Sequence, residues 1–352
     1  MLFRSKDIYV TCTGCSNITA LNITAGYNQS SLVATITCDT STLDLNDIVT
    51  VDAGYTDSHQ QVFYGRVKDI TRNREEGNIT IVAKDILIDA SDYFLVSDNP
   101  DEPFKRQNIL AEDLIGDLLE QAGLTNYAPN VPLSFTYGVS VPAEFNLISI
   151  MDACNQIANI LAWHVYADVT TIRFEDIRPY FRTDADKFTD YGLHLGDDVI
   201  SHTLRTYVGL VSDPSGTKNI IKSIDRTYSD EGLRNRVVVY GRDTIKAKAQ
   251  TSSPYLPVDF YKSAVIASPL IDSTEMAQAA ANYNLSLYNR LTESCTLVLL
   301  GDASIKPRQF CDIYDEFTGC TGSTPNDRAW FVQSVSHNIS AGGFETRLTC
   351  TR

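Results

Sequence analysis

The sequence lacks the short motifs that mark most enzyme classes. It contains no G-x-S-x-G turn, no phosphate-binding G-x-x-x-x-G-K-[ST] loop, no H-E-x-x-H zinc motif and no dinucleotide-binding glycine pattern. None of its five histidines stands four residues from another on a predicted helix, and no two carboxylates stand out as an acid–base pair. We therefore expect no catalytic residue, no cofactor and no enzymatic activity.

Long apolar runs are also missing. None approaches the roughly 18 to 20 residues that a membrane-spanning helix needs. The opening Met-Leu-Phe-Arg-Ser-Lys-Asp does not begin a secretory signal peptide. Methionine (3) and tryptophan (2) are scarce, whereas tyrosine (18), phenylalanine (14) and β-branched residues are plentiful, which favours strands. The 352 residues exceed one ordinary core, so we expect a soluble, mainly β protein of two to four domains.

Basic residues are too few for nucleic-acid binding. Lys and Arg number 29 against 44 Asp and Glu, which gives a formal net charge of −15. Proteins that grip phosphates need clustered positive charge, so we expect no sequence-specific nucleic-acid binding. The acidity indicates plain solubility, and it also suits a surface that DNA passes without adhering.

The cysteines provide only an incomplete metal-binding motif. Cys12 and Cys15 have the spacing of metal ligands, but no second C-x-x-C completes a four-thiolate zinc site. They are weak metal candidates, and reduced, partly buried thiols are the favoured interpretation. Disulfides stay open for a particle that spends time outside a cell. The eight cysteines are Cys12, Cys15, Cys38, Cys154, Cys295, Cys311, Cys320 and Cys350.

An internal repeat organises the chain. A shift of 265 positions aligns residues 47–83 with 312–348 without a gap, and matches Gly54 with Gly319 and Asn73 with Asn338. Alternating apolar residues and turn glycines in both copies indicate a strand, a turn, a second strand, a hairpin turn and a third strand. Chance similarity of two β-hairpins is the alternative to a duplicated module.

The segments between the two copies have sequence patterns that predict helices as well as strands. We expect two amphipathic helices followed by a hairpin, then a return to β structure, and a final helix inside the second module. The expected segments are helices at 106–124 (with Gly123 just past its end) and 147–161, strands at 163–168 and 171–174, β structure at 217–243 with 234–241 among the opening strands of the second module, and a helix at about 275–291 capped by Ser273.

These patterns predict four parts. Residues 1–95 form a first β-barrel module, and 96–200 form an α+β middle domain. A second β-barrel module comprises 201–246 and 294–352, and a helical insertion at 247–293 interrupts it. The fold class is therefore mainly β with α+β insertions, and with two related barrel modules per chain.

A small basic group lies in the first copy of the repeat. Two interpretations stay open: charges that protect an exposed strand edge, or contacts with an acidic partner or a neighbouring subunit. The interface candidates, taken from this group and from the hairpins of both copies, are Arg66, Lys68, Arg72, Arg74, Asn73, Gly77, Asn338, Gly342 and Gly343.

Five stretches, in the same order, resemble the tail hub proteins of phages, a family that includes the myophage baseplate hub and the late-control gene D type. The Cys12-x-x-Cys15 segment does not fit the family's pattern, and the chain ends at Arg352 without the Gly-rich tail of close relatives, so a fused lysozyme or spike domain is not expected. The similar stretches are Tyr64–Ile70 with Ile79–Asp85, Ala111–Leu124, Trp163–Tyr166, Asn235–Gly241 and Ser334–Phe344.

The resemblance implies a structural role. Members of this family carry two related barrels per chain, and three chains form a trimeric pseudo-sixfold ring that joins the sixfold tail tube to the threefold spike. The partners it implies are further copies of the chain, the tail tube protein, the central spike, baseplate wedge proteins and the tape measure protein, with DNA passing through the channel. The implied location is the tail baseplate of a virion, made in the host cytoplasm.

Two other functions compete with this interpretation. A carbohydrate- or receptor-binding virion module would also be rich in tyrosine and β structure, but it would not need an internal repeat. A hydrolase that acts on the cell wall would need an acid–base pair, and none can be nominated. The host, the tail type and the exact interface residues do not follow from the sequence.

Overall fold

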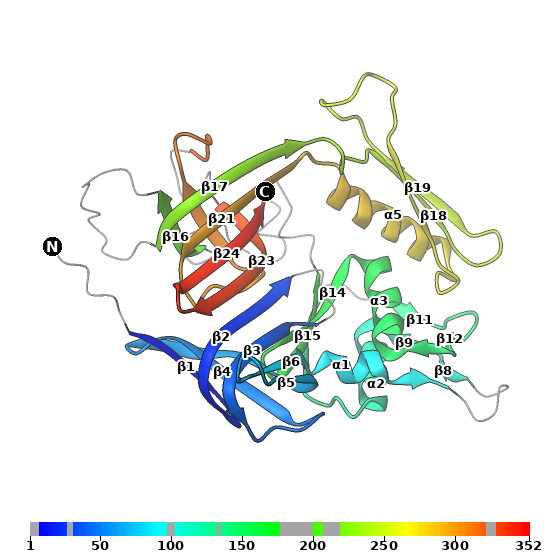
Figure 1. Cartoon of the computed structure of the whole chain (residues 1–352). Coiled ribbons are helices and arrows are strands. Elements are labelled where there is room, and N and C mark those ends of the chain that lie inside the picture. Colours follow the sequence, from blue (N-terminus) through cyan, green and yellow to red (C-terminus); the bar gives the residue numbers. More distant parts are fainter. Residues whose placement is uncertain are drawn as a thin grey trace. The chain divides into compact units, whose positions relative to one another are not determined.

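The computed structural model describes residues 7–26, 31–96, 103–131, 135–176, 200–206, 219–321 and 329–352 (Figure 1). The chain divides into two compact units: residues 1–86, 194–227 and 293–352 form unit 1, and residues 87–193 and 228–292 form unit 2. Among the described residues, no helix is both long and apolar enough to cross a membrane. Repeat positions 322–328 and middle-domain positions 177–199 lie outside the described residues.

Unit 1 begins with a run of six antiparallel strands, which we call the first module. Their order in the sheet is β1-β4-β5-β6-β3-β2. The two end strands, β1 and β2, are joined in the chain by Thr13 and Gly14 alone, so the two ends of the run meet at one corner. The strands are β1 (Ile8–Cys12), β2 (Cys15–Gly26), β3 (Val33–Ser41), β4 (Ile48–Tyr55), β5 (Ser58–Asn73) and β6 (Asn78–Asp85).

A second set of six strands completes the sheet of unit 1, and we call it the second module. Its order is β23-β22-β16-β17-β21-β24, and β24 also pairs with β23, so every strand of this set has two neighbours. The strands are β16 (Ile200–Thr206), β17 (Asn219–Ser229), β21 (Thr292–Leu300), β22 (Phe310–Tyr314), β23 (Ala329–Ser340) and β24 (Gly343–Thr351).

The two modules share one strand order. Read from β4, the first module runs β4-β5-β6-β3-β2; read from β22, the second runs β22-β23-β24-β21-β17. A β-bulge interrupts the β5–β6 pairing between Val67 and Asp69, and another interrupts the β23–β24 pairing between Val332 and Ser334, 265 residues later. The predicted strand–strand–hairpin–strand unit is therefore confirmed in both copies.

The gap-free alignment is wrong outside β5 and β23. Ile70 pairs with Ile81 in the first module, and its counterpart Val335 pairs with Leu348, so Ile81 matches Leu348 and not Thr346. The cause is the hairpin turn: four residues separate Asn73 from Asn78, whereas two separate Ser340 from Gly343. Register slips of this even kind keep the same residues on the buried face.

The β4 match shifts as well, by three positions. Tyr64 pairs with Thr50, and its counterpart Ala329 pairs with Asp312, so Asp312 takes the place of Thr50 and not of Asp47. Each module nevertheless buries its own core at matching positions. Ala34, Ile36 and Cys38 of β3 are buried as Cys295, Leu297 and Leu299 of β21 are. Burial of apolar side chains at about 25 cal/mol per Å² is the main stabilising contribution of both cores.

An antiparallel ladder between β2 and β23 joins the modules. It runs from Leu21 opposite Ile339 to Gly26 opposite Ser334. His337 lies within it, opposite Ile23 on one side and Thr346 on the other. Its ring is buried, and Nδ1 lies 3.1 Å from the Thr346 hydroxyl. Burial lowers the pKa of His337 to about 4, because a buried imidazolium is poorly solvated.

Unit 2 contains the helices. The three predicted helices are confirmed. The first two begin later than predicted, because Ile109 first pairs with Tyr137 and Ser149 caps the next helix by accepting from the Asp152 amide. The helices are α1 (Leu87–Asp92), α2 (Ala111–Gln121), α3 (Ile150–Leu161) and α5 (Thr274–Tyr288), the last capped by Ser273 as predicted.

Small sheets surround these helices. The predicted hairpin β14–β15 is confirmed, and β10 adds a parallel strand to it. The segment 234–241, which we expected among the opening strands of the second module, forms β18 between β19 and β20 instead, and α5 packs on β18 and β19. The strands are β7 (Phe94–Leu95), β8 (Phe104–Arg106), β9 (Ile109–Leu110), β10 (Tyr127–Asn130), β11 (Thr136–Tyr137), β12 (Ala143–Phe145), β13 (Ile148–Ser149), β14 (Trp163–Asp168), β15 (Thr171–Asp176), β18 (Arg236–Tyr240), β19 (Lys246–Gln250) and β20 (Ser263–Ala267).

The buried histidine predicts an acid-sensitive module junction. The folded-state pKa of His337 lies below its usual value of about 6.5, so the unfolded state binds the proton first and stability falls as pH drops from about 6.5 to about 4. At pH 5 this group should cost about 2 kcal/mol of unfolding free energy relative to pH 7.5. His337→Gln should flatten the slope in urea unfolding, and His59→Gln, at an exposed position, should not. Equal slopes in all three proteins would contradict this account.

Candidate functional site

The candidate metal ligands Cys12 and Cys15 lie together at the corner between β1 and β2. The Cys12 thiol donates to the Cys15 sulfur at 3.4 Å. This hydrogen bond is the main reason that the pKa of Cys15 falls to about 6, while burial opposes the shift. The pKa of Cys12 is raised, first by the same bond and then by burial. All eight cysteines are free thiols, and no group of three or more possible metal ligands occurs among the described residues.

The basic candidates lie along the second half of β5 and in its hairpin turn. Arg66 and Lys68 are half-buried, whereas Arg72 and Arg74 are exposed. Asn73 shapes the turn itself, because its Oδ1 accepts from the amides of Glu75 and Glu76. Gly77 closes the turn at φ +67°, a conformation that residues with a Cβ rarely adopt.

The second-copy candidates lie at the corresponding hairpin of β23 and β24. Gly343 (φ +118°) pairs with Ser340, and the Gly342 amide donates to the Ser340 hydroxyl. Asn338 lies opposite Asn22 of β2. The structure therefore brings Asn338 into the ladder between the modules, whereas its counterpart Asn73 lies on the corresponding part of β5.

Among the described residues, one edge of β5 has no neighbour where β23 binds β2. The β4 ladder ends at Arg66, and the loop before β4 reaches only Val67. From Asp69 to Asn73, the pairing in the described chain is with β6 alone. The corresponding part of β23 pairs with β24 on one side and β2 on the other. We call Asp69–Arg74 the open β5 edge.

Most side chains of the open β5 edge are also more exposed than their counterparts in β23. Each residue from Asp69 to Arg72 is more exposed than its counterpart in β23; Arg72, for example, is exposed, whereas His337 is buried. This part of β5 is therefore more open to solvent than the corresponding part of β23. Unpaired edges of this kind bind another strand unless something blocks them.

A second open edge lies on β17, the counterpart of β2. β16 accompanies β17 only from Asn219 to Ile221. Beyond that point, the described residues of β17 pair only with β21, which lies on the other side. The stretch Lys222–Ser229, which we call the open β17 edge, is exposed or half-buried throughout. This edge could not be predicted from the sequence, because only the strand order reveals that β17 corresponds to β2.

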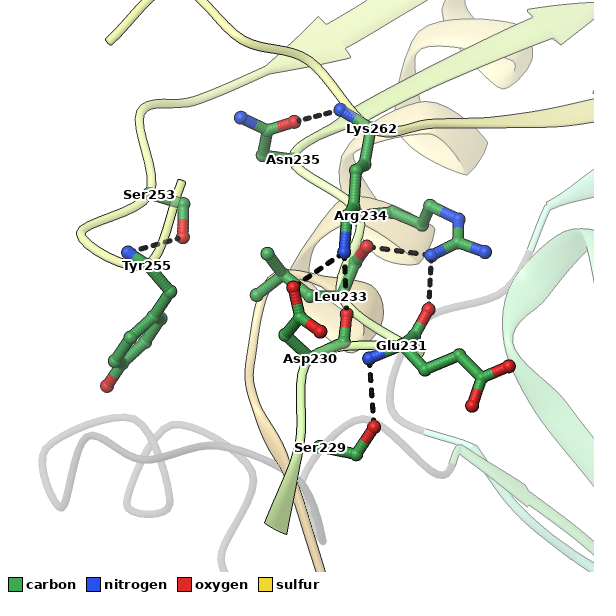
Figure 2. A network of polar contacts seen from close by, with 9 residues as sticks. All are labelled: Ser229, Asp230, Glu231, Leu233, Arg234, Asn235, Ser253, Tyr255 and Lys262. Atoms are coloured by element: carbon green, nitrogen blue, oxygen red, sulfur yellow. Dashed lines mark hydrogen bonds and ion pairs between the residues drawn. The ribbon is translucent and has the colours of Figure 1, made fainter. Parts of the chain in front are cut away.

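In unit 2, a network of polar contacts lies at the base of the loop between β19 and β20 (Figure 2). The buried side chain of Asn235 accepts from the Lys262 amide and donates to the Phe260 carbonyl, both at 2.9 Å. Lys262 in turn binds the Asp230 carboxylate at 2.7 Å.

The side chains of this loop project into solvent, although its backbone is held. Val258 is 92% exposed, Tyr255 55% and Phe260 50%. Exposed apolar side chains on one loop make it a candidate surface for a protein contact. The run Tyr-Leu-Pro-Val-Asp-Phe-Tyr at 255–261 is the signal that sequence reasoning could have used.

No family model and no curated protein matches this sequence. Solved structures do match. A tail protein from Neisseria meningitidis MC58 superposes with a TM-score of 0.67 at 11% identity, with 98% of this chain and 97% of that chain covered. The 43 kDa tail protein of prophage MuSo2 from Shewanella oneidensis gives a TM-score of 0.61 at 12% identity, with 98% and 97% covered.

A third match comes from a secretion system. An E. coli component of the type VI secretion system, described as structurally similar to the T4 tail proteins gp27 and gp5, gives a TM-score of 0.56 at 7% identity, with 97% of this chain and 76% of that chain covered. Identities this low establish the fold alone. At that level the resemblance to phage tail hub proteins is confirmed: the chain has the fold of phage and prophage tail proteins.

Proposed function

We propose that this protein is the structural hub of a phage or phage-like tail, in which three copies form a ring of six modules. One observation carries the proposal. Within a chain, β2 of the first module pairs with the edge of β23 in the second. The counterparts of these two strands are β17 and the open β5 edge, and in the described chain these two do not pair with each other.

Repeating the same ladder between chains satisfies both open edges. β17 of one copy would pair with the open β5 edge of the next, as β2 pairs with β23 inside the chain. Such a head-to-tail contact adds copies in one direction. The copies either close into a ring or continue as an open filament. With two modules per chain, three copies supply six similar modules, which matches a sixfold tube on one face and threefold symmetry on the other.

The remaining features fit a ring at the end of a tail. The proposed partners are the tail tube protein, the central spike, baseplate wedge proteins and the tape measure protein, and the proposed location is the tail baseplate of a virion. The net charge of −15 favours a channel wall that repels phosphates, so that DNA passes without binding. Each module is proposed to act as a barrel around its own core. No catalytic step is needed for this role.

Light scattering tests the oligomer. The 39.0 kDa chain should elute as a species of about 117 kDa, three times the chain mass. The mass should stay constant over a tenfold dilution from micromolar concentration, because a closed ring forms more contacts per copy than an open oligomer. A stable monomer, or a mass that grows with concentration as in a filament, would contradict the ring.

Two neighbouring proline variants test the β5 edge. Consecutive amides of a strand point to opposite sides, so Thr71→Pro and Arg72→Pro remove one donor from the β6 ladder and one from the open edge. The variant that keeps the β6 ladder should stay folded, with the higher melting temperature of the two variants, but elute as a monomer of about 39 kDa. The other should unfold more readily. If both variants keep the oligomeric mass of the parent, β5 is not the contact.

A further inference from the structure

The cysteine pair at the β1–β2 corner lies close to disulfide geometry. Cys12 ends β1 and Cys15 begins β2, with the turn Thr13-Gly14 between them. Gly14 makes the turn tight at φ +73° and lies against Leu43, which a Cβ would approach to 2.9 Å. The two sulfurs are 3.4 Å apart, whereas a disulfide bond is about 2.05 Å long, so bond formation needs only a small movement.

The two thiols are suited to different steps. Cys15 is half-buried and open to reagents, whereas Cys12 is buried and donates its S–H to the Cys15 sulfur. A donor in this position favours the thiolate form of Cys15 over the thiol. A thiolate is the nucleophile in thiol–disulfide exchange, and a neighbouring thiol resolves the mixed disulfide.

We propose that Cys12 and Cys15 are an oxidation site at which a disulfide forms and locks the corner of the first module. The Cys15 thiolate attacks glutathione disulfide, forms a mixed disulfide and releases one glutathione thiolate. Cys12 then loses its proton and attacks the Cys15 sulfur, which expels the second glutathione. The protein loses two protons and two electrons, which one glutathione disulfide takes up to become two glutathione molecules.

The position of the pair gives the bond a structural consequence. Cys12 lies opposite Val51 of β4, and Cys15 lies opposite Ser41 of β3. The disulfide would therefore connect the two ends of the six-strand run through the corner that the chain already turns. A particle assembled in a reducing cytosol would acquire this bond after release into an oxidising environment. The proposal does not depend on the hub function.

Peptide mapping of the full chain tests the bond. The purified protein is incubated with glutathione disulfide at pH 7.5, freed of the reagent, alkylated with iodoacetamide in denaturant so that buried thiols react, and cut with chymotrypsin, which cleaves between Cys15 and Cys38. We expect a peptide with Cys12 and Cys15 that is 2 Da lighter than its dithiol and not alkylated, because each S–S bond removes two hydrogens. Cys38 should be alkylated on a separate peptide.

Variants provide the controls. Cys38→Ser should still form the bond, whereas Cys12→Ser and Cys15→Ser should not. Oxidation should raise the melting temperature of the parent and of Cys38→Ser by about 3 to 6 °C, and that of Cys15→Ser by none. A bond between Cys15 and Cys38, a persistent mixed disulfide with glutathione, or full alkylation of Cys12 and Cys15 would each overturn the proposal.

Discussion

The β2–β23 ladder is the interaction on which unit 1 depends. It joins two sets of six strands that share one order, and it does so through backbone hydrogen bonds at the edge of each set. Edge strands with free amides and carbonyls are normally protected against pairing. Here one such edge is paired inside the chain, and in the part of the chain that the structure describes the equivalent edges on β5 and β17 stay open. One chain thus contains one complete contact between modules, the β2–β23 ladder. It also carries the two edges, on β5 and β17, that a second contact of the same kind would need.

The sequence predicted the parts that repeat locally. Alternating apolar residues and turn glycines predicted β5, β6, β23 and β24. Apolar residues at helical spacing predicted α2, α3 and α5. Registers could not be predicted, because a four-residue turn after Asn73 and a two-residue turn after Ser340 shift β24 against β6 without changing which face is buried. The placement of 234–241 also differed, since its run of valines suits a strand in either unit.

The candidate site, too, was predicted only in part from the sequence. Position along the chain drew attention to Arg72 and Asn73, but their significance lies in what β23 does at the same place, which only the strand pairing reveals. The exposed loop at Val258 and Phe260 escaped notice because apolar residues near proline resemble an ordinary buried turn until their exposure is known. Cys12 and Cys15 were weak metal candidates beside the favoured interpretation of reduced, partly buried thiols, and the structure places their sulfurs 3.4 Å apart in a hydrogen-bonded pair.

The central claim is that modules within and between chains meet through one kind of ladder. Electron microscopy of the purified protein, averaged without imposed symmetry, measures this most directly. The account predicts closed rings with six similar lobes around a central opening and threefold symmetry, with β17 of each copy beside β5 of the next. Rings of another symmetry, open filaments, or threefold particles whose modules meet through other strands would contradict it.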